Sequence, residues 1–249
     1  MKDIKIYIAA HKKVDLPNVD GYIPLQVGAA LHDDLGYLKD SNGDNISTKN
    51  PNYCELTGLY YIWKNEKSDI VGLTHYRRYF FKNLFKTKLN DVLNKNEIEK
   101  YLDKYDVILP KKLYFRKSIG EQYKIIHNTN DLEKCLKIIE KKYPDYVESY
   151  NKIIKRKYLY GYNMFIMNKN KFDEYMKWLF DILTILEKEI DISKYDDYNK
   201  RIYGFLSERL FNIWIDKNKL KIKEIPVYNI EESKTKYIKN NVENFVKKI

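Results

Sequence analysis

A run of cationic and aromatic residues directly follows an apolar stretch in the first third of the chain. Residues 68–81 read SDIVGLTHYRRYFF, and the part DIVGLT is typical of a buried β-strand. His75, Arg77 and Arg78 come immediately after it. Arginine binds phosphate through two parallel hydrogen bonds and keeps its charge when partly buried. The spacing therefore predicts a diphosphate-binding site at the carboxyl end of a strand.

The side to which each arginine points depends on the backbone after that strand. If the chain stays extended through residues 74–78, His75 and Arg77 face one side of the strand while Arg78 faces the other. The alternative to phosphate binding is an ion-pair network within the protein. The carboxylates available for it are Asp33, Asp34, Asp44 and Glu208.

Other predicted strands also end in cationic or amide side chains. Ligands of open α/β sheets bind at the carboxyl ends of the strands, so these ends are the places to search. They comprise residues 11–13, 75–78, 110–112 and 168–169. Lysine, arginine and histidine dominate the set, and such a rim favours a phosphorylated ligand.

Several motifs of known chemistry are missing from the sequence. It contains no P-loop, no GxGxxG, no GxSxG and no HExxH. The four histidines are scattered at positions 11, 32, 75 and 127, without ligand-like spacing, so a zinc site is not expected. His127 precedes a predicted helix and is expected to be structural. P-loop ATPases and Rossmann dehydrogenases are therefore disfavoured.

Glu208 is the candidate general base. It lies in GFLSERLFNIW, and it would face the rim of the sheet if the apolar side of that helix packs inward. The alternative is a surface carboxylate beside Arg209.

The composition indicates a globular basic protein. The chain has 249 residues, and 46 Lys and Arg against 35 Asp and Glu give a net charge of +11. This charge favours a nucleic acid, an anionic membrane surface or a phosphorylated substrate, unless it is only a solvated lysine surface. The two cysteines suggest no disulfide framework, and the sequence shows neither a signal peptide nor a membrane span. A cytoplasmic location is expected, with possible peripheral contact at the inner face of the membrane.

Strands and helices alternate along the chain, which predicts an α/β fold with a mainly parallel central sheet flanked by helices. Residues 1–249 are expected to form a single domain with a basic tail from about Lys234. Strands are predicted at 4–10, 69–74, 105–110, 160–170 and 220–230, and a long loop at 33–50. Helices are predicted at 50–65, 96–105, 171–190 and 204–218, with two more across 130–157 broken at Pro144.

Four segments resemble a known family when taken in order. They are GDNISTKNPNYCELTGLYYIWKN, DIVGLTHYRRYF, YNMFIMNKNKFDEYMKWLFDIL and RIYGFLSERLFNIWI. The family is a domain-of-unknown-function family from bacterial capsule, exopolysaccharide and O-antigen clusters, and the resemblance covers nearly the whole chain. Some members are glycosyltransferases, including galactofuranosyltransferases. The resemblance implies a glycosyltransferase that uses a nucleoside diphosphate sugar, with UDP as the expected nucleotide and UDP-galactofuranose as one candidate donor.

The order of elements is also similar to GT-A nucleotide-sugar transferases, in which an aspartate motif carries a divalent metal. Here HYRR occupies that position, which implies a metal-independent enzyme whose arginines neutralise the departing diphosphate. No metal site is therefore expected, although the loop DSNGDN at 40–45 leaves Mn²⁺ or Mg²⁺ open.

The resemblance implies a role for each candidate residue. His75, Arg77 and Arg78 would hold the diphosphate, with His75 and Glu208 as the catalytic residues. The nucleotide and donor sugar would lie near His11, Lys12, Asp44 and Asn45. Asn163 would lie by the acceptor, a saccharide or lipid-linked saccharide of a surface polysaccharide.

Two rival functions remain open. A non-enzymatic nucleic-acid-binding module would use the positive charge and the abundant aromatic residues, but no RNA-binding motif is present and no nucleic acid partner is expected. An inactive glycosyltransferase fold could instead serve as a partner in a polysaccharide assembly complex.

Overall fold

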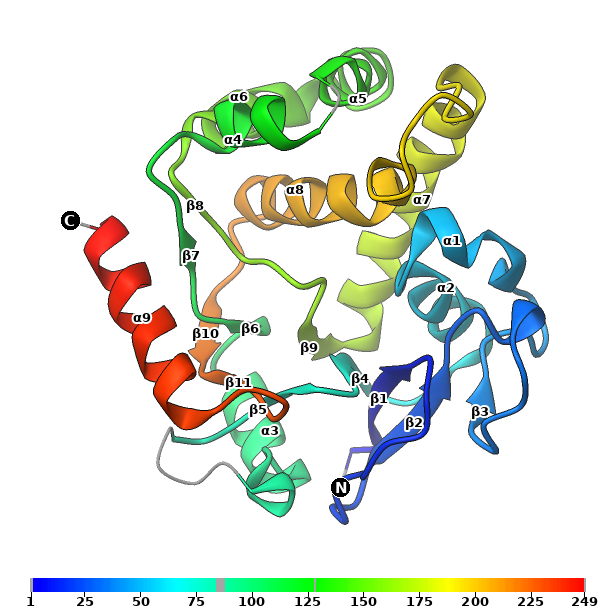
Figure 1. Ribbon diagram of the computed structural model, residues 1–249, viewed down its shortest axis with the longest axis vertical. Helices are drawn as coiled ribbons and strands as arrows, with labels where there is room; N and C mark the ends of the chain where they lie inside the picture. The colour runs from blue at the N-terminus through cyan, green and yellow to red at the C-terminus, as the bar shows by residue number, and fades with distance from the viewer. Residues whose placement is uncertain (1, 84–87, 128, 249) are drawn as a thin grey trace.

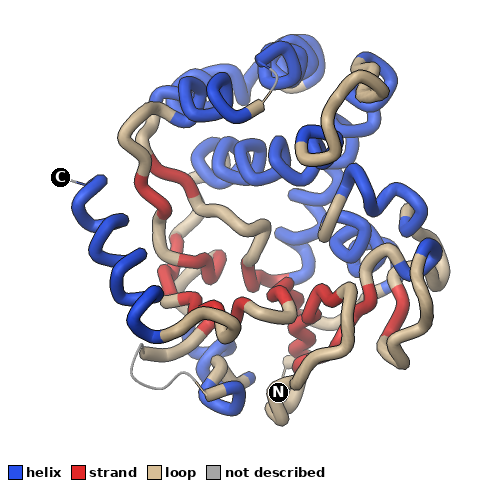
Figure 2. The backbone as a smooth tube through the Cα atoms, in the orientation of Figure 1, coloured by secondary structure: helices blue, strands red, loops and turns tan. Residues whose placement is uncertain are grey.

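The computed structural model of the protein describes residues 2–83, 88–127 and 129–248. Over these residues a central β-sheet is packed against helices (Figure 1). In the same view the strands gather in the lower half, and most of the helices lie above them (Figure 2). The predicted α/β architecture, a mainly parallel sheet flanked by helices, is confirmed.

Nine strands form the main sheet in the described part of the chain, and seven of them follow the order β10-β6-β9-β4-β1-β2-β3. Neighbouring strands are parallel except that β9 runs antiparallel to both β4 and β6. β5 pairs with β4 and β11, also antiparallel. The strands of the main sheet are β1 (Ile4–Ala10), β2 (Tyr22–Gln26), β3 (Leu38–Lys39), β4 (Ile70–His75), β5 (Arg78–Phe80), β6 (Val107–Pro110), β9 (Phe165–Asn168), β10 (Ile222–Ile225) and β11 (Val227–Asn229), while β7 (Leu113–Tyr114) and β8 (Tyr158–Leu159) form a separate pair.

The helices cover both faces of this sheet. They are α1 (Asn50–Tyr53), α2 (Leu56–Asn65), α3 (Lys95–Leu102), α4 (Ile119–Ile126), α5 (Thr129–Lys142), α6 (Val147–Lys155), α7 (Lys169–Glu189), α8 (Ile202–Lys217) and α9 (Lys234–Lys248), with 3-10 turns η1 (Ala29–Leu31), η2 (Ser47–Lys49), η3 (Leu89–Asp91), η4 (Pro144–Tyr146) and η5 (Asn199–Arg201). The break at Pro144 between α5 and α6 is as predicted. The basic segment from Lys234 forms α9.

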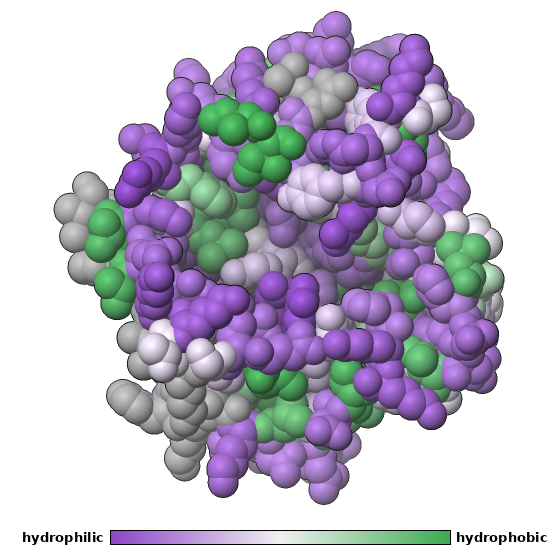
Figure 3. Space-filling view, in the orientation of Figure 1, coloured by the Kyte–Doolittle hydropathy of each residue, from purple (hydrophilic) through white to green (hydrophobic). Residues whose placement is uncertain are grey.

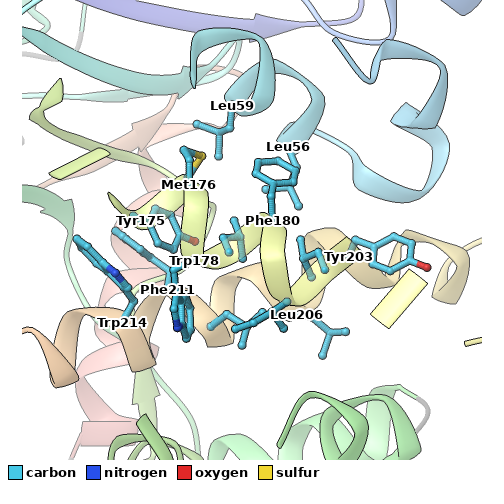
Figure 4. Packing of buried hydrophobic residues seen from close by; sticks show 14 of the residues in the cluster. Leu56, Leu59, Tyr175, Met176, Trp178, Phe180, Tyr203, Leu206, Phe211 and Trp214 are labelled. Atoms are coloured by element: carbon cyan, nitrogen blue, oxygen red, sulfur yellow. The ribbon is translucent and has the colours of Figure 1, made fainter. Parts of the chain in front are cut away.

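The larger part of the hydrophobic core lies between the sheet and helices α2, α7 and α8. Figure 4 shows Trp178 and Phe180 of α7 among residues of α2 and α8. On the other face of the sheet, Ile98 and Leu102 of α3 pack against Ile6 and Ile166. Alternate residues of each strand supply the two cores, because successive side chains point to opposite faces. The central strands are therefore held from both sides.

The chain does not stay extended after β4. Tyr76 and Arg77 form a turn, and Arg78 begins β5 directly opposite His75 in an antiparallel pair. Directly opposed residues of an antiparallel pair project their side chains to the same face of the sheet. The expectation that His75 and Arg78 face opposite sides of the strand is therefore wrong, since a turn replaces the extended geometry.

Two other predictions about local structure need correction. The helix predicted over 50–65 is interrupted at Cys54, whose φ of 53° and ψ of −133° separate α1 from α2. The predicted loop at 33–50 contains β3 and η2, and the preceding strand β2 was not predicted. β2 reads YIPLQ and has little polar alternation, so it lacks the usual strand signal.

Because β9 is antiparallel to β4, its first residues rather than its last ones lie at the cationic edge where β4 ends. Asn168 pairs with Ile70 at the start of β4, so residues 168–169 lie at the opposite edge from His75. Their predicted place on the rim is wrong. The chain just before β9, at Tyr162 and Asn163, lies instead at the edge of the sheet where β4 ends with His75. Both residues have positive φ, 72° and 50°, a conformation that non-glycine residues adopt rarely and that makes this segment a place to search for function.

Candidate functional site

A pocket of about 730 Å³ opens where β1 and β4 end. Its volume falls in the range of small-molecule sites, about 300–1,000 Å³. Figure 3 shows the face hollowed near its centre, between the regions of α8 and of β4 and β5. The charged and titratable side chains that line the pocket are His11, His32, Cys54, Glu55, His75, Tyr76, Arg77, Arg78, Tyr162, Arg201 and Glu208. Five of the predicted site residues thus meet in one cavity: His11, His75, Arg77, Arg78 and Glu208.

The backbone of Tyr162 joins two of these groups. Its carbonyl lies 2.7 Å from His75 Nε2, and its N–H donates to Glu208 Oε1 at 2.6 Å. A carbonyl only accepts, so Nε2 of His75 carries the proton and Nδ1 is left as an acceptor in the neutral ring. The left-handed conformation at Tyr162 thereby fixes both His75 and Glu208 at the pocket.

Asn163 belongs to a buried network behind the pocket. Its Nδ2 donates to Glu55 Oε1 at 2.6 Å and to the Gly204 carbonyl at 3.2 Å, and its Oδ1 accepts from the Ser207 hydroxyl at 3.0 Å. Asn163 is only 2% exposed. Its side chain is thus bound to the protein rather than presented to a ligand, and it holds the carboxylate of Glu55, which lines the pocket.

Three arginines line the pocket, and their partners differ. Arg77 Nη1 lies 3.7 Å from Glu231 Oε2, and Arg201 Nε donates to Cys54 Sγ at 3.2 Å. The guanidinium of Arg78 lies 4.8 Å from the centre of the Tyr162 ring. No carboxylate of the described residues comes within ion-pair distance of Arg78. Asp33, Asp34, Asp44 and Glu208, the partners considered for an internal ion-pair network, therefore form no direct ion pair with Arg78, although its charge lowers the pKa of Glu208 against the rise that burial causes.

The remaining predicted residues lie outside the pocket lining. Lys12 pairs with Glu231 at 2.9 Å and sits over the Tyr76 ring at the margin of the pocket. Asp44 is exposed and accepts from the Tyr60 hydroxyl at 3.2 Å, while the Asn45 amide donates to the carbonyls of Ser41 and Gly43. Asn45 thus holds its own loop together, and Asp44 ties that loop to α2.

The Glu208 side chain is only 22% exposed, so Glu208 is a half-buried carboxylate rather than a surface one. Arg209 beside it is only 3% exposed and donates to Glu208 Oε2 at 3.1 Å and to Gln122 Oε1 at 3.0 Å. Burial raises the pKa of the Glu208 carboxyl, while Arg209 and the N–H of Tyr162 act in the opposite direction. A raised pKa brings a carboxyl group closer to the range in which general acid-base catalysis works well.

His75 is expected to be uncharged at neutral pH, because burial lowers the pKa of its imidazole. The charge of Glu55 opposes this shift, whereas Arg78 adds to it. Glu55→Gln should therefore lower the pKa of His75 further, as followed by NMR titration of the ring. The pKa of His127, which burial also lowers without a contribution from Glu55, serves as the internal control. An unchanged or higher pKa of His75 in Glu55→Gln would contradict this arrangement.

Two findings concern metals and membranes. In residues 2–83, 88–127 and 129–248, no three His, Cys, Asp or Glu side chains form a group that could hold a metal ion. Among the helices that the structure describes, none is both long and apolar enough to cross a bilayer.

Six of the eleven charged or titratable residues that line the pocket were not predicted as site residues: His32, Cys54, Glu55, Tyr76, Tyr162 and Arg201. Glu55 stands at the start of α2, and the break at Cys54 turns it toward the pocket. Tyr162 is brought in by the direction of β9, and Arg201 by the start of α8. Apart from His32, all of them lie in segments that carry the family resemblance, Arg201 as the first residue of RIYGFLSERLFNIWI, and this is the signal that could have found them.

The fold is that of a glycosyltransferase-like protein. It matches the apo structure of WbbM, a bifunctional glycosyltransferase, with a TM-score of 0.85 and 34% sequence identity over 92% of this chain. That match covers 46% of the WbbM chain, so this chain spans less than half of that protein. Residues 5–219 match the model described as Domain of unknown function (DUF4422), and the chain belongs to this family. No protein with a curated description matches the sequence.

Proposed function

We propose that the protein is a glycosyltransferase that moves a sugar from a nucleoside diphosphate sugar to a saccharide acceptor. UDP is the nucleotide we favour, UDP-galactofuranose is one candidate donor, and the setting is the synthesis of a bacterial surface polysaccharide. The observation that carries the proposal is the clustering of Arg77, Arg78 and Arg201 in one pocket of a glycosyltransferase-like fold. Guanidinium groups at that place suit a diphosphate better than any uncharged ligand.

The arginines would act on the leaving group. Glycosyl transfer passes through a transition state with oxocarbenium character, in which negative charge builds up on the departing diphosphate. Arg78 is the best placed, because it lines the pocket without a carboxylate partner among the described residues. We propose that this charge makes a divalent metal unnecessary.

The acid-base chemistry would fall to Glu208, with His75 beside it. Glu208 would accept the proton of the attacking acceptor hydroxyl. Neutral His75, with Nε2–H held by the Tyr162 carbonyl, presents Nδ1 as a hydrogen-bond acceptor for substrate rather than as a cation for phosphate. We assign Asn163 the positioning of Glu55, in place of a direct acceptor contact.

The nucleotide would lie along the end of β1. His11 lines the pocket there, with its ring edge-to-face on Tyr76 at 4.9 Å. Burial and the charges of Lys12 and Arg77 lower the pKa of His11, so it would offer a neutral ring to the base or ribose. Lys12 could reach the donor after leaving Glu231, whereas Asp44 and Asn45 would contribute only through their loop.

A thermal-shift panel tests the proposal. We expect UDP and UDP-sugars to raise the melting temperature more than GDP, CMP and dTDP and their sugars, with the same shift in excess EDTA. Transfer to a saccharide acceptor in EDTA would support the metal-free mechanism, and activity that needs added Mn²⁺ would contradict it. If no nucleotide sugar shifts the melting temperature, the proposed function is wrong. Binding without transfer or hydrolysis of any donor would favour an inactive partner.

A further inference from the structure

A second pocket, of about 320 Å³, lies directly beside the first. Arg78 and Tyr162 line both pockets. We propose that this second pocket is the binding groove for the saccharide acceptor, and the assignment rests on the proposed function. An anion held by Arg78 would lie at the boundary between the pockets, so a sugar attached to that anion would be next to whatever occupies the groove.

One wall of the groove is a face of α9. Its residues Tyr237, Asn240, Asn241 and Asn244 follow at i, i+3, i+4 and i+7, and all four line the groove. An amide side chain both donates and accepts hydrogen bonds, as a sugar hydroxyl does. Asn240 is exposed. Asn240 and Asn241 donate through Nδ2 to Glu232 and to the Tyr237 carbonyl, so the groups they offer a sugar hydroxyl are their Oδ1 acceptors.

The β7 segment supplies aromatic rings to the lining. Tyr114 and Phe115 line the groove at and after β7, and Tyr162 stands at the junction with the first pocket. The C–H groups on the face of a sugar ring pack on the electron-rich face of an aromatic ring. A groove lined by both aromatic rings and amides fits a saccharide chain.

Helix α9 and the β7 segment are bound to each other. Asn244 Oδ1 accepts from the N–H of Tyr114 at 2.7 Å, and its Nδ2 donates to the carbonyl of Lys112 at 2.9 Å. The side chain thus pairs with the backbone of the β7 segment as a neighbouring strand would. These hydrogen bonds hold α9 against the β7 segment, so the shape of the groove depends on α9.

Charged side chains of both signs line the groove. The cationic ones are Arg78, Lys111, Lys112 and Lys247, and the carboxylates are Glu232 and Glu243, while Lys112 is also paired with Glu224 at 3.1 Å. The first pocket has three guanidinium groups, those of Arg77, Arg78 and Arg201, and guanidinium binds phosphate through two parallel hydrogen bonds. We therefore assign the diphosphate to the first pocket and the saccharide to the groove.

Amide chemical-shift mapping by NMR tests this assignment, with lactose, maltotriose and cellotriose as neutral probes and UDP as the anionic probe. We expect at least one oligosaccharide to shift the amide signals of Tyr114 and Asn240, and UDP to shift those of His75 and Arg77. Asn240→Trp should block the groove and weaken the oligosaccharide response about tenfold or more, leaving the UDP response in place. Val242→Trp is the matched control, because Val242 lies on the same helix and is 57% exposed outside the groove.

The outcomes separate the two proposals. Oligosaccharide shifts confined to the first pocket, UDP shifts confined to the groove, or no shift with any of the three oligosaccharides would overturn the assignment of the groove. A groove that binds an oligosaccharide in a protein that binds no nucleotide sugar would instead remove the glycosyltransferase proposal. An equal loss in Asn240→Trp and Val242→Trp would show a disturbed α9 and would also count against the groove.

Discussion

Replacing Arg78 with alanine should weaken the binding of UDP roughly 10- to 150-fold. Hydrogen bonds to charged groups contribute about 1.5–3 kcal/mol each, and the Arg78 guanidinium has no competing carboxylate among the described residues. Turnover should fall further than affinity, by about 10²–10³-fold, because the charge on the leaving diphosphate is greatest in the transition state. Isothermal titration calorimetry with UDP and a transfer assay measure the two effects separately.

Arg77→Ala should have a smaller effect on both quantities. Its guanidinium is 40% exposed and already lies 3.7 Å from the carboxylate of Glu231, so binding a diphosphate means exchanging one anionic partner for another. Arg116→Ala is the matched control, because Arg116 is exposed and lines neither pocket. Equal UDP affinity in Arg78→Ala and Arg116→Ala would contradict the proposed diphosphate-binding site. Arg78→Lys should recover part of the affinity, since lysine restores the charge without the bidentate geometry.

The cationic residues after β4 could be predicted from the sequence because the signal is local. An apolar strand followed at once by His75, Arg77 and Arg78 places these residues at a strand end, where α/β sheets bind ligands. The turn at Tyr76 and Arg77 could not be predicted, since neither residue is a usual turn former. That turn is what brings both arginines to one pocket.

The rest of the site depends on contacts between distant segments. His75 and Tyr162 are 87 residues apart, and Glu55 and Asn163 are 108 apart. Both contacts require β9 to enter the sheet antiparallel to β4, a direction that its short apolar sequence leaves open. The sequence pointed to Asn163, but its side chain serves the site from behind rather than at the surface.

Glu208→Gln should lower turnover by about 10²–10⁴-fold if Glu208 is the general base. The change keeps the size of the side chain, and its carbonyl oxygen can still accept from the N–H of Tyr162, as Oε1 does at 2.6 Å. UDP affinity should not fall, because removal of a negative charge from the pocket lessens repulsion of the diphosphate. Initial rates and UDP titration on the same protein provide the test. Glu148→Gln, at an exposed glutamate of α6, is the control.

The pH dependence distinguishes a base from a carboxylate that only supports the pocket. A base works when ionised, and burial raises the pKa of Glu208, so kcat/KM should fall as pH drops through this raised pKa. The residual activity of Glu208→Gln should lack that decline. The NMR titration of His75, whose pKa is lowered by burial, identifies any separate contribution of the imidazole. If kcat/KM of Glu208→Gln still declined at low pH as in the unmodified enzyme, Glu208 would not be the base. Its carboxylate would then only support the structure of the pocket, and Glu55, the other carboxylate that lines the pocket, would be the next candidate.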